Sequence, residues 1–195
     1  MSSIEPLVKS VPSVIAGGIE TSLPFAATVR TDHRRGMRLL IDHLQGRGHV
    51  RIAHVGGLGG PVGEVRTEEY ARAMQETGLS THIQIEKADF TEISGYHAAY
   101  RLLESSDPPT AITAINDLSA VGVLGALGER SDIAVTGYGD SAIADFQLTQ
   151  LTTVRAHNGE VGRKAVEELL RAESELDSSP REVLVKSSLV VRRTA

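Results

Sequence analysis

Two polar residues follow a predicted buried strand and could contact a ligand. Asn116-Asp117 come directly after the largely apolar run 110–115 and precede a helical pattern over 118–127. A short side-chain oxygen at that position can accept from the free N–H groups of the first helical turn. An asparagine also offers a donor and an acceptor to a sugar hydroxyl or an amide. Because open α/β sheets bind ligands at the carboxyl ends of their strands, Asn116 is either a ligand contact or a pure helix cap.

A glycine-rich loop and an arginine follow another predicted strand. The loop runs from Gly56 to Gly63, and Arg66 begins the next predicted helix. The loop matches neither the dinucleotide-binding glycine pattern nor the phosphate loop that ends in Gly-Lys-Ser/Thr, so we interpret it as a connection at the mouth of a pocket. The fixed fork of donors on Arg66 could hold ligand hydroxyls or a carboxylate. The alternative is an exposed surface arginine.

The other polar and aromatic candidates do not define a catalytic site. Phe90 is either an apolar wall for a ligand ring or a core residue. Asp89, Asp117 and Asp140 follow predicted strands, but their spacing specifies neither a metal site nor an acid–base pair. The sequence has no cysteine, no His-x-x-x-His spacing and no Gly-x-Ser-x-Gly turn. We therefore expect no metal, no cofactor and no enzyme; a small α/β enzyme using Asp140 and His157 is the alternative.

Strands and helices alternate along the chain, which is the pattern of a parallel sheet with helices on both faces. The last extended segment, residues 183–191, follows the last predicted helix. The other strands are expected near 13–16, 26–30, 49–55, 83–85, 110–115, 133–136 and 151–154, and the helices near 36–45, 66–77, 94–103, 118–127 and 161–170.

Composition limits the class of protein. The chain has 195 residues, of which 41% are hydrophobic and 23% charged, and its net charge is −5. Such a chain is globular, and its negative charge argues against a phosphate-binding face of its own for nucleic acid. No apolar run approaches the roughly 18 residues of a membrane-spanning helix, and residues 1–6 lack the pattern of a secretory signal. We expect a cytoplasmic protein with no membrane partner.

Five ordered segments together resemble the effector-binding domain of LacI/GalR-type transcriptional regulators. They cover nearly the whole chain from about residue 12 to residue 193. The segments are GMRLLIDHLQGRGHVRIAHVGG, ADFTEISGYHAAYRLLES, PPTAITAINDLSAVGVLGAL, DIAVTGYGDSAIADFQLTQLTTVRAHNGEVGRKAVEELL and LVVRR.

The resemblance implies a periplasmic-binding-protein-like fold with two α/β subdomains, three crossovers and a small polar effector, such as a sugar, in the cleft between the subdomains. The family's ligand arginine falls on Arg66, its cleft asparagine on Asn116 and its aromatic wall on Phe90. Arg35, just before the glycine of the first helix, is a further expected ligand contact. Asp140 is the candidate to replace an acid that the family usually has one residue earlier.

The resemblance also implies domain boundaries. Residues 13–48 would form part of the N-terminal subdomain, 49–154 the C-terminal subdomain, 155–178 a return to the first and 179–193 a return to the second. The crossovers would lie near 47–50, 154–157 and 178–182. The family's helix-turn-helix and first βα units do not precede Ser13, so we expect one complete and one incomplete subdomain, with DNA bound only through a head domain not in this chain.

Three positions depart from the family pattern. Gly139 stands where the family usually has a ligand-binding aspartate, and Ala156 where a glutamine or similar polar residue is expected. Glu69 replaces a customary glycine. Two polar ligand contacts are therefore missing, and the sequence leaves the identity of the effector open.

A smooth, small-residue helix face suggests self-association. It consists of Ala120, Val121, Val123 and Leu124, and in the family the equivalent helix contributes to a homodimer. The alternative is that this face packs inside its own subdomain. We interpret the chain as the ligand-sensing, dimerising core of a LacI-type regulator, with a stand-alone carbohydrate-binding protein as the alternative.

Overall fold

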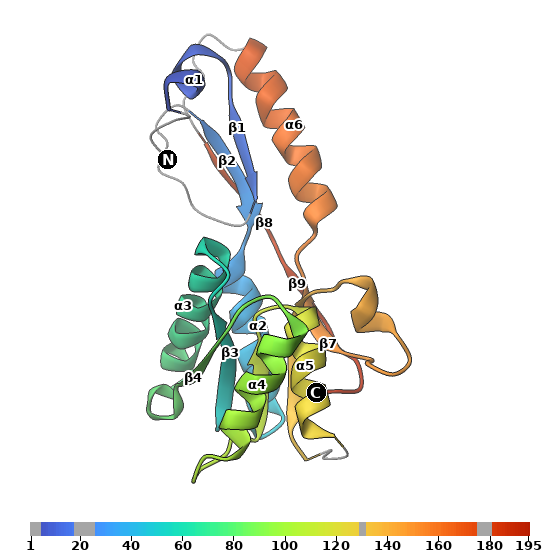
Figure 1. Cartoon of the computed structure of the whole chain (residues 1–195). Coiled ribbons are helices and arrows are strands. Elements are labelled where there is room, and N and C mark those ends of the chain that lie inside the picture. The colour runs from blue at the N-terminus through green and yellow to red at the C-terminus, as the bar shows by residue number, and fades with distance from the viewer. Residues whose placement is uncertain (1–4, 18–25, 129–131, 175–180) are drawn as a thin grey trace. The chain divides into compact units, whose positions relative to one another are not determined.

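The computed structural model describes residues 5–17, 26–128, 132–174 and 181–195 (Figure 1). The chain forms two compact units. Unit 1 contains residues 1–32 and 157–186, and unit 2 contains residues 33–156 and 187–195. Each unit is built around its own parallel sheet, which confirms the predicted parallel α/β class. None of the helices in the described part of the chain has the length and apolar character needed to cross a bilayer.

Unit 2 is a six-stranded sheet covered by helices on both faces (Figure 1). The strand order is β4-β3-β5-β6-β7-β9; the first five strands are parallel and β9 is antiparallel to β7. The strands are β3 (Ile52–Gly57), β4 (Gln84–Ala88), β5 (Ala111–Ala114), β6 (Ala134–Gly139), β7 (Thr152–Arg155) and β9 (Ser188–Val190), and the helices are α2 (His33–Gly46), α3 (Pro61–Glu76), α4 (Glu92–Leu103) and α5 (Asp117–Leu127), with short turns η1 (Ser80–His82) and η2 (Ala142–Asp145).

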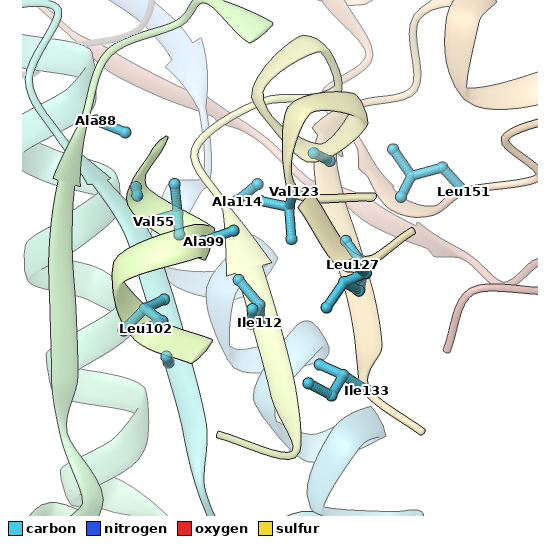
Figure 2. Close-up of a cluster of buried hydrophobic side chains, with 14 of the residues drawn as sticks. Val55, Ala88, Ala99, Leu102, Ile112, Ala114, Val123, Leu127, Ile133 and Leu151 are labelled. Carbon is cyan, nitrogen blue, oxygen red and sulfur yellow. The ribbon is translucent and has the colours of Figure 1, made fainter. Parts of the chain in front are cut away.

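Side-chain alternation along the strands of unit 2 gives it two cores. One face of the sheet packs against α4 and α5 in a cluster that includes Val55, Ile112, Leu102 and Val123 (Figure 2). The opposite face packs against α2 and α3, whose apolar stripes contain residues such as Leu40 and Met74. Because successive strand residues point to opposite faces, nearly continuous apolar strands are what a sheet covered on both sides requires.

The small residues of α4 and α5 bring these two helices together. A Cβ on Gly122 would lie 2.0 Å from the carbonyl oxygen of Glu92, and a Cβ on Gly95 would lie 2.2 Å from that of Ser119. The small-residue face of α5 thus packs against α4 within unit 2. Of the residues predicted for a dimer interface, Ala120 and Val123 are fully buried in the α4–α5 core, which favours the alternative of packing inside the subdomain, whereas Val121 and Leu124 are half-buried.

Unit 1 is smaller. Its parallel sheet has the order β1-β2-β8, with β1 (Val14–Gly17), β2 (Ala27–Thr31) and β8 (Glu182–Val185), and its helices are α1 (Glu5–Ser10) and α6 (Asn158–Ser174). Its buried core consists of Val29, Val161 and Val185, against which Val14, Ala165 and Val183 pack.

The unit boundaries differ from those predicted from the sequence. The helix α2, expected in the N-terminal subdomain within residues 13–48, belongs to unit 2, because its buried stripe packs with Tyr138 and Val154. The strand β8, expected in the C-terminal return 179–193, pairs with β2 in unit 1. The units therefore change at 32/33, 156/157 and 186/187. Part of the predicted crossover 178–182 lies outside the described residues.

Candidate functional site

Arg66 lies at the carboxyl ends of strands β4, β5 and β6 of unit 2. Its Nη1 donates a hydrogen bond of 2.7 Å to the carbonyl oxygen of Ile115, directly after β5. Its Cζ lies 4.1 Å from the ring centroid of Tyr138 in β6 and 5.9 Å from that of Phe90, just after β4. The guanidinium is thus held between a carbonyl group and an aromatic face, and we call Arg66, Tyr138, Phe90 and Asn116 the arginine cluster.

The charge of Arg66 is poorly solvated. Burial lowers the pKa of its guanidinium, and the charges of Tyr138 and Asp117 only partly oppose this shift. Its Nε is buried and has no hydrogen-bond partner among the described residues. A buried cation without a full set of partners is costly, so this group is a strong candidate for a ligand contact.

Asn116 has two structural roles in the arginine cluster. Its Oδ1 accepts from the backbone N–H of Ser119 at 2.8 Å, which caps α5. Its Nδ2 donates to the carbonyl oxygen of Phe90 at 3.0 Å. The amide therefore fixes both the helix start and the loop that carries Phe90, which supports the cap interpretation; ligand binding by Asn116 stays a prediction.

Phe90 lies half-buried against the glycine-rich loop. A Cβ on Gly59 would lie 2.5 Å from the Cδ2 of Phe90, so a side chain at this loop position would collide with the ring. Gly59 also has φ of 87°, a conformation that glycine adopts without strain. The loop is thus a close-fitting connection that positions the aromatic ring beside Arg66.

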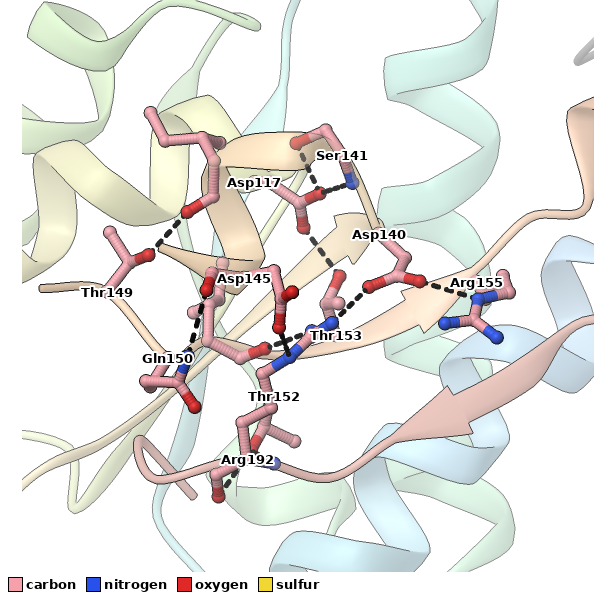
Figure 3. Close-up of polar contacts among 12 residues, drawn as sticks. Asp117, Asp140, Ser141, Asp145, Thr149, Gln150, Thr152, Thr153, Arg155 and Arg192 are labelled. Atoms are coloured by element: carbon pink, nitrogen blue, oxygen red, sulfur yellow. Dashed lines mark hydrogen bonds and ion pairs between the residues drawn. The ribbon is translucent and has the colours of Figure 1, made fainter. Parts of the chain in front are cut away.

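Asp117 is buried and ties three segments together (Figure 3). Its Oδ1 accepts from the hydroxyl of Thr153 in β7 at 2.5 Å, and its Oδ2 accepts from the N–H and the hydroxyl of Ser141 at 2.7 and 2.8 Å. A Cβ on Gly137 would lie 2.4 Å from Oδ1, so the strand must carry glycine there. The carboxylate of Asp117 stabilises this edge of the sheet and is already fully engaged.

Asp140 is held by two arginines (Figure 3). Its side chain is 8% exposed, and its carboxylate pairs with Arg155 Nε at 2.5 Å and Arg192 Nη2 at 2.8 Å. Burial by itself would raise the pKa of Asp140, but the hydrogen bonds and charges of Arg192 and Arg155 outweigh it, and the pKa is lowered. Asp140 could contact a ligand only by giving up one of these pairs, so its predicted role as a substitute ligand acid stays a prediction.

Arg35, the remaining predicted contact, lies exposed on α2. Its Nε donates at 3.0 Å to the carbonyl oxygen of Ser187, the first residue of the segment that leads to β9. This bond joins α2 to the last part of unit 2. Ligand binding by Arg35 likewise stays a prediction.

Tyr138 was not identified from the sequence as a site residue. It is almost fully buried, and its hydroxyl lies 3.0 Å from Nδ1 of His33. Gly36 makes room for it, because a Cβ there would lie 2.5 Å from the tyrosine hydroxyl. The only available signal was the aromatic residue before Gly139, which reads equally well as a core residue. The ring of Tyr138 now fixes one side of the Arg66 guanidinium.

His54 supports the helix that carries Arg66. It is fully buried, with Nδ1 2.9 Å from the hydroxyl of Thr113 and Nε2 3.1 Å from that of Thr67. Burial, together with the charge of Arg66, lowers the pKa of His54 to about 3. The imidazole is therefore neutral at physiological pH and joins β3 and β5 to the residue next to Arg66.

Comparison with known proteins decides the family. The sequence-family model of the periplasmic binding protein-like domain matches residues 41–195. The crystal structure of a LacI transcriptional regulator from a Rhodococcus species is 33% identical, with a TM-score of 0.90 over 99% of this chain and 73% of that chain. This chain belongs to the LacI family of transcriptional regulators. It corresponds to their effector-binding domain.

Other LacI-family proteins are similar over much of the chain. The ribose operon repressor of Escherichia coli K12 is 35% identical over 142 residues, which are 69% of this chain and 43% of that protein. Catabolite control protein A of Priestia megaterium is 31% identical over 84% of this chain and 52% of its own length. The structure of the regulator CelR in complex with cellobiose is 29% identical, with a TM-score of 0.82 over 95% of this chain and 59% of that chain. The chain thus spans about half the length of these curated relatives.

Proposed function

We propose that this chain is the ligand-sensing part of a LacI-type regulator and that a small polar molecule binds beside Arg66. The observation that supports the proposal is the position of the Arg66 guanidinium at the carboxyl ends of parallel strands. The guanidinium contacts Ile115 and Tyr138, and its Nε has no hydrogen-bond partner among the described residues. Open α/β sheets use this edge for ligands. The half-buried ring of Phe90 would pack against the apolar face of the ligand.

A carbohydrate-like ligand is supported by the family. The related regulator CelR forms a complex with cellobiose. In the complete regulator, ligand binding would shift a conformational equilibrium and so change affinity for operator DNA. Contact with DNA would fall to another part of the complete regulator, in keeping with the net charge of −5 on this chain. The role is regulatory and not enzymatic, as the names of the related repressors suggest.

Titration calorimetry with cellobiose and ribose tests this proposal. Arg66→Met should weaken binding of whichever sugar binds by at least about tenfold, because it removes charge-assisted hydrogen bonds. Arg72→Met is the matched control, since Arg72 lies on the same helix, is half exposed and pairs only with Glu69 in the described structure. Sugar binding that both variants retain in full would contradict a site at Arg66.

We also propose that the chain forms a homodimer through the outer face of α4 and α5. This face exposes Ile93, Tyr96 and Tyr100 on one side of α4, and Leu118 on α5. Exposed aromatic residues at helical spacing are typical of an interface core. Tyr100→Glu should convert dimers to monomers in light scattering without loss of helicity. Arg72→Glu on α3, which packs on the opposite face of the sheet, should leave the dimer intact. An unchanged mass for Tyr100→Glu would count against this interface.

A further inference from the structure

We propose that the ligand of the arginine cluster carries a negatively charged carboxylate or phosphate group that binds Arg66. This inference rests on the proposed function, because it concerns the same site, and it narrows the chemical class of the ligand. It predicts that sugar acids or sugar phosphates bind better than the corresponding neutral sugars.

Arg66 lacks a counter-ion within the described part of the chain. Arg34, Arg38 and Arg101, on other helices of unit 2, form ion pairs with acidic side chains at the surface. Arg66 has no ion pair among the described residues, although its Nε is buried. Proteins normally pair a buried charge, so a missing partner at a candidate binding site points to one supplied by the ligand.

The acids near Arg66 already bind other groups. Asp117 attracts Arg66 electrostatically, but its two oxygens accept from Thr153 and Ser141. Asp140 pairs with two other arginines. Neither carboxylate can turn to Arg66 without breaking its own hydrogen bonds.

Gly139, the residue between Tyr138 and Asp140, cannot supply the missing charge either. It has no side chain, and its φ of 134° disfavours any L-residue there. A Cβ at this position would lie 3.3 Å from Oδ2 of Asp117, so an acid placed here would also meet an existing carboxylate. This edge of the sheet therefore cannot readily supply the missing negative charge from position 139.

The guanidinium of Arg66 is also preorganised for an oxyanion. Arginine has five N–H donors in a planar fork that matches the paired oxygens of a carboxylate or a phosphate. In Arg66 one donor binds the carbonyl oxygen of Ile115, and the Cζ lies 4.1 Å from the centroid of the Tyr138 ring, so the group is held from two sides. A guanidinium held in one orientation loses little side-chain entropy when it binds an oxyanion. Because Arg66 uses one donor for the carbonyl group of Ile115 and lies over the ring of Tyr138, its other N–H donors can bind such a ligand.

The experiment compares neutral and anionic members of matched pairs: glucose with gluconate and glucose 6-phosphate, ribose with ribose 5-phosphate, and inorganic phosphate alone. Calorimetry with the whole chain should show at least one anionic member binding about tenfold more tightly than its neutral partner. Preference for gluconate would identify a carboxylate, and preference for a sugar phosphate a phosphate. Raising the salt concentration should weaken the anionic member more than the neutral one.

Two variants test whether Arg66 causes the preference. Arg66→Met should abolish it, Arg66→Lys should retain part of it because the charge stays while the fork is lost, and the control Arg72→Met should leave it unchanged. Circular dichroism checks that each variant is folded. If Arg66→Met does not fold, the anion preference of Arg66→Lys and its salt dependence test the inference instead.

The outcomes separate this inference from the proposed function. Equal or tighter binding of the neutral sugar, lost in Arg66→Met, would overturn the charged ligand and leave the sensing role intact. An anion preference that survives in Arg66→Met would overturn the inference, because a residue other than Arg66 would then bind the negative charge of the ligand. Failure of every probe to bind would count against both.

Discussion

The two units differ in how completely their sheets are covered. In unit 2 helices pack on both faces, and the two clusters bury large side chains such as Ile112, Leu40 and Tyr70. In unit 1 the described residues bury one small valine cluster, and α6 exposes Val166 and Leu170, the latter at 60%. A groove of about 360 Å³ lies beside Val14 and Leu169 in unit 1.

This difference shows why all the predicted site residues lie in unit 2. Side chains that bind a ligand must be held in place by rigid surroundings, and a sheet covered on both faces provides such surroundings. Arg66, Tyr138 and Asp117 each follow or belong to elements packed in the large clusters. Unit 1 stabilises its strands with much less buried apolar surface, so we expect it to open locally at a lower free energy.

Hydrogen exchange should show the largest effect. We expect the amides of β2 in unit 1 to exchange at least about 100-fold faster than those of β5 in unit 2, because opening unit 1 exposes less apolar surface. Mass spectrometry of peptides that cover the two strands measures this ratio. Equal protection of both strands in a monomer would contradict the expected lower opening free energy of unit 1.

Glycine substitutions on one helix of each unit should have opposite signs. Gly122→Ala in α5 should destabilise the chain by about 2 kcal/mol, because its Cβ would lie 2.0 Å from the backbone of α4. Gly162→Ala in α6 meets no atom within 4 Å and should stabilise unit 1 by up to about 1 kcal/mol through helix propensity. Denaturant unfolding measures both. A neutral Gly122→Ala would show that the helices of unit 2 can separate at little cost.

Mild acid should destabilise unit 2 through His54. Its pKa is about 3 in the folded chain and about 6.5 when unfolded, so between these values only the unfolded chain binds the proton. Stability is therefore full above about pH 6.5 and falls by at most about 1.4 kcal/mol per pH unit below it. Unfolding midpoints of the wild type and His54→Gln between pH 7 and pH 5 test this. The variant should lose less stability than the wild type, and parallel curves would contradict the assignment.

Local patterns predicted the elements well but not their partners. The amphipathic stripe of α2 shows that one face is buried, yet not against which sheet. The sequence therefore placed the helix with residues 13–48, whereas it belongs to unit 2. The small residues of α5 suggested a contact surface, but only the position of Gly95 on α4 reveals that the contact is internal. These relations depend on residues far apart in the sequence.

The site was predictable to the same extent. The sequence left Asn116 open between a helix cap and a ligand contact, and the structure shows the cap. Arg66 was singled out by its residue type and by the family resemblance, with an exposed surface arginine as the alternative. The role of Tyr138 was not predictable, because a single tyrosine in a strand carries no sign of the guanidinium stacked on it. The pairing of Asp140 with Arg155 and Arg192 was equally hidden, since it joins residues 15 and 52 positions apart.

The central claim is that ligand binding engages the guanidinium of Arg66. The ¹⁵N resonance of its buried Nε reports this directly, and comparison with Arg66→Lys assigns it. Titration with the tightest-binding sugar, sugar acid or sugar phosphate should shift this resonance in step with the calorimetric binding curve. Saturation of binding with the Nε resonance unmoved would contradict the account.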